Sequence, residues 1–240
     1  MTKPTITILQ LYPRDMNIYG DNGNVLVLQR RLEWQDITPN IISYNVGDTL
    51  PEHVDIIIGG GGQDSGQDRI QKDLLSIAPK LREWAEAGTP MLMVCGLYQL
   101  FGKYFKTVEG HVIEGISIFD ITTHGSHERL IGNIVTRSSE FGDIVGYENH
   151  SGQTILGDEV TALASVIKGA GNNSGDGHEG ARYKNVIGTY LHGSLLPKNP
   201  KIADFLIRTA LKNADISHEK QPINDKYAEQ ARKIALQRPR

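Results

Sequence analysis

The stretch MLMVCGLYQL, residues 91–100, places a continuous apolar run directly before a cysteine and a glycine. Four apolar residues in a row are typical of a buried strand in a parallel sheet, and the residues after Cys95 favour a helix. A cysteine between the two would lie on a tight corner at the carboxyl edge of the sheet, where open α/β sheets bind ligands. The dipole of the helix would favour the thiolate form of Cys95. The stretch therefore predicts an α/β fold with a reactive thiol.

Strand-like runs alternate with segments of helical period on both sides of this stretch. This pattern predicts a mainly parallel sheet flanked by helices. Between about residues 110 and 190 it becomes less regular, with short β-like pieces and many glycines. The predicted strands are 5–11, 41–44, 55–58, 91–94 and 186–190, and the predicted helices are 24–34, 70–87 and 201–213.

The composition excludes several classes of protein. The chain has 240 residues, 22% of them charged, a formal net charge of -3 and one cysteine. One cysteine cannot form an internal disulfide, and no Cys/His cluster has zinc spacing. Lysines and arginines are scattered except near the C-terminus, so nucleic acid is not an expected partner. No run approaches the roughly 18 to 20 apolar residues of a membrane span, and the N-terminal run does not suit a secretory signal, so we expect a cytoplasmic location.

The C-terminal segment differs in character from the rest of the chain. Residues 216–240 are polar and basic with a helical pattern, whereas no repeat, low-complexity tract or linker divides the residues before them. We therefore expect one domain over residues 1–215, followed by a basic helical extension over residues 216–240.

Four consecutive glycines, residues 59–62, follow the predicted strand at 55–58. Such a loop lets the backbone lie very close to another group. It has neither the Lys-Ser/Thr of a P-loop nor the spacing of a dinucleotide fingerprint, so close approach to a small substrate is the better interpretation. Backbone N–H groups from Gly96 and from this loop could form an oxyanion hole. A lone cysteine is often a small core residue, but the neighbouring glycine loop favours a catalytic role for Cys95.

A thiolate nucleophile needs a base, usually a histidine. Of the eight histidines, His192 is best placed because it directly follows the predicted strand at 186–190. His150 and His178 remain alternatives. The glycine-rich stretch 169–180, which contains His178, is interpreted as a solvated surface loop.

Several motifs together resemble the class I (triad-type) glutamine amidotransferases, and within them the cobyric acid synthase-like branch. They are CGLYQL after a strand, the glycine loop one strand earlier, and GTYLHG at 188–193. The resemblance is closest to the GatD subfamily, the glutaminase subunits of lipid II isoglutaminyl synthases. It covers roughly residues 5–212 and implies a flavodoxin-like fold. The stretches that carry the subfamily resemblance are YGDNGNVL at 19–26, GGGQD at 60–64, GYENH at 146–150 and LHGSLLPKNP at 191–200.

The resemblance implies that Cys95 attacks the side-chain amide of L-glutamine, forms a γ-glutamyl thioester and releases ammonia. His192 would be the general base and acid. Gly60 and Gly96 match the oxyanion-hole positions of the family.

The resemblance also implies two substrate-binding residues. Gln99 matches a position that helps to hold the substrate, and Arg129 matches the arginine that holds glutamine. A guanidinium fork suits an α-carboxylate, although a surface salt bridge is the ordinary role of a single arginine.

The sequence departs from the family pattern at two places. Met93 and Leu97 replace the two glycines of the usual Gly-x-Cys-x-Gly corner, so the turn around Cys95 must tolerate side chains. Ser194 stands where the usual His-x-Glu has its glutamate, so no local carboxylate orients His192. The subfamily resemblance implies that an aspartate of the partner subunit completes the triad.

The implied partner is a MurT-like, Mur ligase-related subunit in a heterodimer. It would use ATP and magnesium to activate the α-carboxyl of D-glutamate in the lipid II stem peptide, and ammonia from Cys95 would then give D-isoglutamine for peptidoglycan synthesis. No cofactor is expected in this chain, which would meet lipid II at the membrane surface only through the partner. Three alternatives stay open: an amidotransferase subunit for another carboxylate such as cobyrinate, a non-catalytic scaffold of the same fold, and a cysteine peptidase or hydrolase of related fold.

Overall fold

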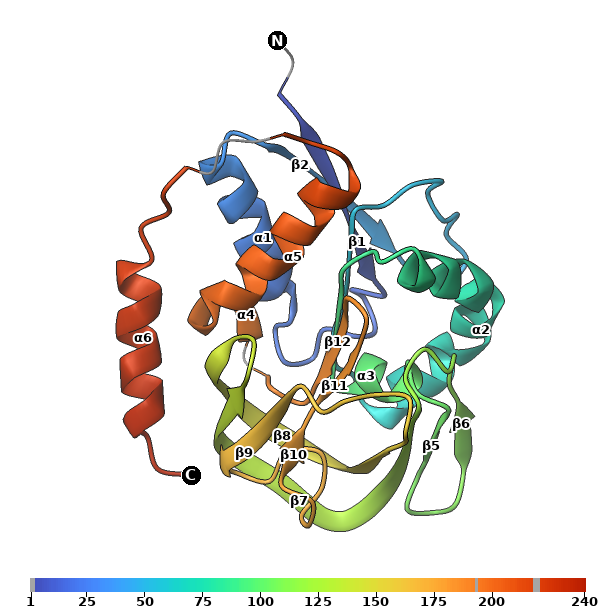
Figure 1. Cartoon of the computed structure of the whole chain (residues 1–240). Helices are drawn as coiled ribbons and strands as arrows, with labels where there is room; N and C mark the ends of the chain where they lie inside the picture. The colour runs from blue at the N-terminus through green and yellow to red at the C-terminus, as the bar shows by residue number, and fades with distance from the viewer. Residues whose placement is uncertain (1–2, 193, 218–220) are drawn as a thin grey trace.

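A computed structural model describes residues 3–192, 194–217 and 221–240 and contains two sheets, which occupy the upper and lower parts of Figure 1. The larger sheet has the strand order β11-β12-β4-β3-β1-β2, and only the β11–β12 pair is antiparallel. Its parallel strands β2-β1-β3-β4-β12 follow the flavodoxin-like order, so the predicted fold class is confirmed. The strands of this sheet are β1 (Thr5–Leu11), β2 (Thr38–Tyr44), β3 (Ile56–Gly59), β4 (Met91–Val94), β11 (Ala181–Tyr183) and β12 (Val186–Thr189).

Helices cover both faces of this sheet. α1 (Asn22–Trp34) and α5 (Pro200–Asn213) lie on one face, and α2 (Asp64–Glu86) lies on the other (Figure 1). α1 buries Val25, Leu28 and Leu32, the apolar positions that predicted it. All three predicted helices are confirmed, each beginning one to six residues before its predicted start.

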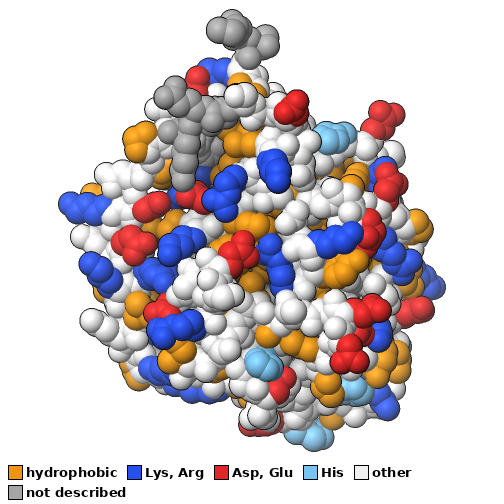
Figure 2. Space-filling model, viewed as in Figure 1, with side chains coloured by type: hydrophobic (Ala, Val, Ile, Leu, Met, Phe, Trp, Pro, Cys, Tyr) orange, Lys and Arg blue, Asp and Glu red, His pale blue; other side chains and the backbone are white. Residues whose placement is uncertain are grey.

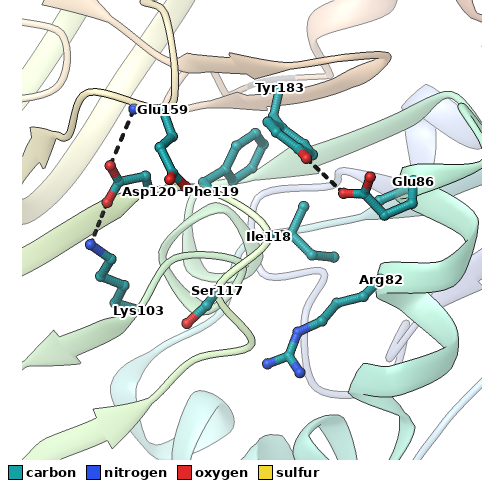
Figure 3. Close-up of a pocket in the computed structure, with 10 residues that line it drawn as sticks. Arg82, Glu86, Lys103, Ser117, Ile118, Phe119, Asp120, Glu159 and Tyr183 are labelled. Carbon is teal, nitrogen blue, oxygen red and sulfur yellow. Dashed lines mark hydrogen bonds and ion pairs between the residues drawn. The ribbon is translucent and has the colours of Figure 1, made fainter.

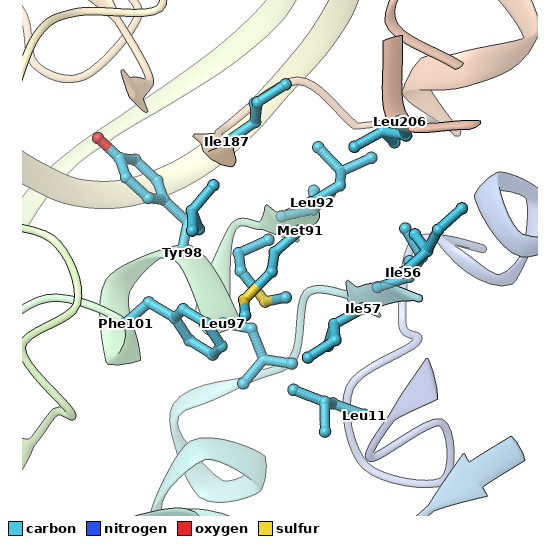
Figure 4. Close-up of a cluster of buried hydrophobic side chains, with 14 of the residues drawn as sticks. Leu11, Ile56, Ile57, Met91, Leu92, Leu97, Tyr98, Phe101, Ile187 and Leu206 are labelled. Carbon is cyan, nitrogen blue, oxygen red and sulfur yellow. The ribbon is translucent and has the colours of Figure 1, made fainter. Parts of the chain in front are cut away.

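The core lies between the sheet and its helices. Every residue of β3, β4 and β12 is buried, as expected for strands covered on both faces. Figure 4 shows Ile57, Leu92 and Ile187 from these strands together with Leu97 and Leu206. This packing fixes the carboxyl ends of the three strands relative to one another, and the predicted site residues follow those ends.

The second sheet differs from the short, irregular pieces predicted between residues 110 and 190. Its two longest strands, β7 (Ile121–Ser138) and β8 (Gly142–Leu156), pair along most of their length with a register shift between Gly125 and Leu130. Glycines and polar residues occupy buried positions of these strands, such as Glu148 and His150 in β8, so the apolar pattern that sequence reasoning relies on is absent. This sheet lies at the carboxyl edge of the larger one (Figure 1). Its other strands are β5 (Tyr104–Lys106), β6 (Val112–Glu114), β9 (Ala164–Lys168) and β10 (His178–Glu179).

The sequence predicts a solvated surface loop over residues 169–180, but part of this stretch is buried. Glu179 is fully buried and accepts hydrogen bonds from the Thr189 hydroxyl at 2.9 Å and from the Tyr190 backbone at 2.8 Å. Asn172 is also fully buried and is bonded to the backbone of Gly180. These polar contacts within the protein replace water, and so they hold the segment against the end of β12.

The C-terminal segment contains α6 (Lys226–Gln237), which buries none of its residues and lies at the outside of the molecule (Figure 1). Residues 218–220 of the predicted extension lie outside the described residues. After α6, the Arg240 guanidinium lies 2.9 Å from the buried carboxylate of Glu148. The division at residue 215 stays a prediction.

Charged side chains of both signs are interspersed on the face that contains α6 (Figure 2). Nothing on this face has the single-sign character of a nucleic-acid surface. No described helix combines the length and the apolarity needed to cross a bilayer.

Candidate active site

Cys95 lies on the predicted corner between β4 and the short helix α3 (Gly96–Leu100). Its backbone has φ 51° and ψ -105°, a conformation that costs free energy for any residue with a side chain. Strained residues of this kind concentrate at functional sites, and a nucleophile on a strand-to-helix turn is a recurring example. The corner that the sequence predicts is therefore confirmed.

The first departure from the family motif, Met93 and Leu97 in place of two glycines, is accommodated by a glycine on the neighbouring strand. A Cβ placed on Gly59 would lie 2.4 Å from the Leu97 side chain and 2.8 Å from the Met93 sulfur. The space that Met93 and Leu97 occupy is thus the space that Gly59 leaves empty. The turn tolerates these side chains because β3 ends in glycine beside them.

His192 follows β12 across the small connection after Thr189, and its backbone N–H donates to the Tyr147 carbonyl at 2.8 Å. A Cβ placed on Gly61 would lie 3.0 Å from the Cys95 Cβ and 3.1 Å from the His192 Cε1. The two predicted catalytic side chains therefore lie against the same side of Gly61, although they are 97 positions apart in the sequence.

The His192 ring is 1% exposed, and neither of its nitrogens has a hydrogen-bond partner among the described residues. The Tyr19 ring lies beside it, with 4.2 Å between the ring centroids. Burial lowers the pKa of His192 to about 3, and the nearby His150 and Arg129 lower it further. Buried ring nitrogens usually have partners, and the described residues supply none for this imidazole.

Cys95 is 6% exposed, and the thiolate expected from the sequence is not the favoured form. Burial raises the pKa of Cys95 well above that of an ordinary thiol, and the charge of Asp21 raises it further. The hydrogen bond from the Gly96 backbone acts in the opposite direction but is a smaller effect. The short helix α3 therefore does not compensate for the loss of solvent, and the chain alone holds a neutral thiol beside a neutral imidazole.

A cavity of about 320 Å³ opens beside Cys95, at the carboxyl edge of the larger sheet and under the second sheet. Its volume is at the lower end of the range for small-molecule pockets. It brings together Cys95, Gln99 and Arg129, three of the residues predicted from the sequence. The remaining lining residues are Tyr19, Gly62, Gln63, Asp64, Ser65, Gln67, Phe105, Asn149, His150, Ser151 and Gly152.

Arg129 extends from β7 at the exposed mouth of this cavity. Its Nε donates to the Asn149 amide oxygen at 2.7 Å, and its Nη2 donates to the Tyr19 hydroxyl at 3.3 Å. Asp64, on the first turn of α2, lies on the same cavity with the opposite charge, and the two form no ion pair in the described part of the chain. The mouth therefore presents one positive and one negative group to a bound molecule.

Gln99 lies inside the cavity wall and is 4% exposed. Its amide oxygen accepts from the Gln67 side chain at 2.7 Å, and its amide nitrogen donates to the Tyr190 hydroxyl at 3.0 Å. These bonds fix the orientation of the amide. Sequence reasoning missed Gln67, which lies one helical turn after Asp64 in α2 and therefore on the same side of the helix.

The two alternative histidines lie in different places. His150 lines the cavity, stacks on Tyr190 with 3.6 Å between centroids, and bonds the Gly152 carbonyl through Nδ1 at 2.8 Å. Burial lowers its pKa to about 4. His178 lies on β10 at the surface. His192, by contrast, lies against Gly61 together with Cys95.

The glycines predicted for the oxyanion hole are sequence neighbours of the two residues that lie together here: Gly60 precedes Gly61, and Gly96 follows Cys95. The Gly60 carbonyl accepts the Leu97 N–H at 3.3 Å, and a Cβ placed on Gly96 would lie 3.1 Å from the Gly62 nitrogen. Gly61 itself donates its N–H to the carboxylate of Asp21 at 2.8 Å, a contact that sequence reasoning missed. The oxyanion roles of Gly60 and Gly96 stay predictions.

A second cavity, of about 280 Å³, contains none of the predicted site residues (Figure 3). Two of its acidic groups are engaged with neighbours: Asp120 pairs with Lys103, and Glu86 accepts from the Tyr183 hydroxyl at 2.6 Å. Its lining contains neither a cysteine nor a histidine. Nowhere in the described residues do three or more His, Cys, Asp or Glu side chains form a group that could hold a metal ion.

Comparison with known proteins agrees with this geometry. The sequence model of the CobB/CobQ-like glutamine amidotransferase domain matches residues 7–200. The chain belongs to this family. Family membership accounts for the cysteine corner, the glycine loop and the histidine after the last parallel strand as parts of one arrangement.

Two relatives are similar over most of their length. Subunit GatD of the glutamine-hydrolysing lipid II isoglutaminyl synthase of Staphylococcus aureus (strain N315) is 38% identical over 97% of this chain and 96% of its own. The subunit of the same name from Streptococcus pneumoniae (strain ATCC BAA-255 / R6) is 37% identical over 86% of this chain and 81% of its own. A glutamine amidotransferase of Thermotoga maritima shares the fold, with a TM-score of 0.56 at 13% identity over 96% of this chain and 93% of that one.

Proposed function

We propose that this chain is the glutaminase subunit of a lipid II isoglutaminyl synthase. It hydrolyses L-glutamine through a thioester on Cys95 and delivers ammonia to a Mur ligase-like partner. That partner amidates D-glutamate of the lipid II stem peptide at the expense of ATP. The contact of Cys95 and His192 with one glycine, beside a cavity that holds Arg129, is the observation that carries the proposal. The names of the two GatD relatives support the acceptor.

The proposed mechanism starts from the neutral Cys95 thiol and the neutral His192 imidazole. His192 takes the thiol proton as the Cys95 sulfur attacks the side-chain carbonyl carbon of glutamine, and backbone N–H groups stabilise the oxyanion. The carbon–nitrogen bond then breaks as His192 protonates the leaving nitrogen, which departs as ammonia. Water, deprotonated by His192, attacks the thioester, releases glutamate and restores the thiol. One group acts in turn as base and acid, as microscopic reversibility requires.

The cavity suits the two charged ends of an amino acid. Arg129 offers a guanidinium for the α-carboxylate, and Asp64 offers a carboxylate for the α-ammonium group. Gln99, held by Gln67 and Tyr190, offers a fixed amide closer to Cys95. A zwitterion bound between Arg129 and Asp64 would direct its side chain inward.

The partner supplies what the chain lacks. His192 has no partner on either ring nitrogen among the described residues, and the sequence provides no carboxylate two positions later. A carboxylate from a MurT-like subunit would orient the imidazole and raise its pKa, because a negative charge favours the protonated ring. ATP and magnesium would be bound by that subunit.

Glutamate release from glutamine, measured for the chain alone and after co-purification with its Mur ligase-like partner, tests this function. We expect slow turnover alone and an increase on the order of a hundredfold or more in the complex, because an imidazole without its orienting carboxylate is a poor base. ATP-dependent amidation of lipid II with glutamine should appear only in the complex. Absence of glutamine hydrolysis in an assembled complex would identify the chain as a scaffold.

Arg129→Gln is expected to raise the KM for glutamine about ten- to a hundredfold in the complex, because a charge-assisted hydrogen bond contributes about 1.5 to 3 kcal/mol. Amidation driven by ammonium chloride should be unchanged. Arg137→Gln is the matched control: Arg137 also lies on β7, is exposed, pairs with Asp143 and does not line the cavity. Loss of both glutamine-driven and ammonia-driven amidation in Arg129→Gln would instead indicate a role in folding or assembly.

A further inference from the structure

Asp21 is a buried carboxylate that the glutaminase mechanism does not use. It immediately precedes α1, where an aspartate ordinarily caps the helix with its side chain. Here it makes no such cap bond, and its side chain reaches the glycine loop instead. It is 2% exposed, and its Oδ1 is buried without a partner among the described residues. A buried carboxylate with a vacant acceptor is costly, so its position calls for a function.

The segment around Asp21 holds both backbone groups of Gly61. The Asp21 Oδ2 accepts the Gly61 N–H at 2.8 Å, and the Gly61 carbonyl accepts the Ile18 N–H at 3.1 Å. A Cβ placed on the adjacent Gly60 would lie 2.9 Å from the Asp21 Cβ and 2.3 Å from the Met16 carbonyl oxygen. The glycine loop is thus clamped in one orientation, with no space for a side chain at Gly60.

The clamped glycine is the one that contacts both Cys95 and His192. The Asp21 carboxylate is therefore bonded to the residue that borders Cys95, and its charge acts on the thiol. An ionised carboxylate at this distance, out of solvent, opposes the formation of a second negative charge on sulfur. Removing the charge should make the thiolate easier to form, whereas removing the hydrogen-bond acceptor should release the loop.

We propose that Asp21 is a positioning residue with two effects: its carboxylate clamps the Gly61 peptide beside Cys95, and its charge restrains Cys95 from becoming a thiolate. Burial raises the pKa of the Asp21 carboxyl to about 6, although the Gly61 hydrogen bond lowers it. The restraint is therefore present above about pH 6 and disappears below it, where Asp21 is protonated. The other titratable groups that face Cys95 are Arg129 on β7, Asp64 on α2, Tyr19, Tyr190 and His192.

Thiol modification of the full-length chain tests the restraint without glutamine. Because Cys95 is the only cysteine, the mass of the intact chain after exposure to methyl methanethiosulfonate reports on this thiol alone. Asp21→Asn keeps an oxygen that can accept the Gly61 N–H but removes the charge. We expect modification about three- to tenfold faster than in the wild type at pH 8, from a charge near the sulfur. The ratio should fall towards one at pH 5.

The pH dependence of that ratio distinguishes lost charge from loosened structure. A loosened loop would speed the reaction by the same factor at every pH, and that result, or no change at all, would overturn the restraint. Asp55→Asn is the matched control. Asp55 is also a buried carboxylate that accepts a backbone N–H, from Thr7 at 2.7 Å, but it lies just before β3, at the opposite end from Cys95. Its variant should modify at the wild-type rate.

The clamp is tested by turnover in the complex and rests on the proposed function. Asp21→Ala removes the acceptor, so we expect its kcat for glutamine to fall about tenfold below that of Asp21→Asn. Equal kcat values in the two variants would overturn the clamp, and thermal melting verifies that both are folded. If the wild-type complex hydrolyses no glutamine, the proposed function fails, yet the thiol measurement still decides whether Asp21 restrains Cys95.

Discussion

Cys95→Ser is expected to lower glutamine-dependent amidation by the complex by a factor on the order of 10⁴ or more. The serine hydroxyl has nearly the shape of the thiol but is far harder to ionise, and His192 in this chain is a weak base with a pKa near 3. Serine therefore cannot form the acyl intermediate at a useful rate. Amidation driven by ammonium chloride should continue, because it needs only the partner's chemistry.

The measurement compares lipid II amidation with glutamine and with ammonium chloride in the same preparation. Thiol modification provides the internal control, since the wild-type chain should take up one equivalent and the variant none. Glutamine-dependent amidation within tenfold of the wild type in Cys95→Ser would show that another group hydrolyses glutamine. Loss of the ammonia-driven reaction as well would show that Cys95 is needed for assembly.

The arrangement of the larger sheet could be predicted because its signals are local. The runs at 55–58, 91–94 and 186–190 are short, apolar and bounded by turn residues, and each coincides with a strand to within one residue. Parallel strands end at a common edge, so Cys95 and His192 could be expected near one another. The structure agrees with that expectation, because Cys95 and His192 both lie against Gly61.

The second sheet and the contacts of the glycine loop could not be predicted in the same way. In β8 the buried positions alternate with less buried ones from Gly146 to Thr154, but glycine, glutamate, histidine and threonine occupy the buried positions, so the sequence has no apolar alternation there. The Asp21–Gly61 hydrogen bond joins a residue just before α1 to a residue just after β3, 40 positions apart in the sequence. Nothing in the local sequence of Asp21 distinguishes it from a helix cap. Gln67 is likewise meaningful only after folding places it against Gln99.

The effect of burial on Cys95 was also beyond the sequence. A helix start after a cysteine predicts an acidic thiol, but α3 has only five residues and the sulfur lies among buried groups. The loss of solvent then outweighs the dipole, so the pKa of Cys95 rises. In the isolated chain, the raised pKa of Cys95 and the lowered pKa of His192 therefore both oppose proton transfer from sulfur to imidazole. A partner carboxylate that raised the pKa of His192 would favour this transfer.

His192→Gln is expected to lower glutamine hydrolysis by the complex about 10³- to 10⁴-fold, since it removes the base that lies against Gly61 together with Cys95. Glutamine fills similar space and keeps the backbone bond to Tyr147 but cannot carry a proton between sulfur and nitrogen. Glutamate release is the measurement, with ammonia-driven amidation as the test of assembly. His178→Gln, at the exposed position of β10, should retain wild-type hydrolysis. A collapse of hydrolysis in His150→Gln, with His192→Gln within tenfold of the wild type, would transfer the role of base to His150, whose neutral ring lines the cavity beside Cys95.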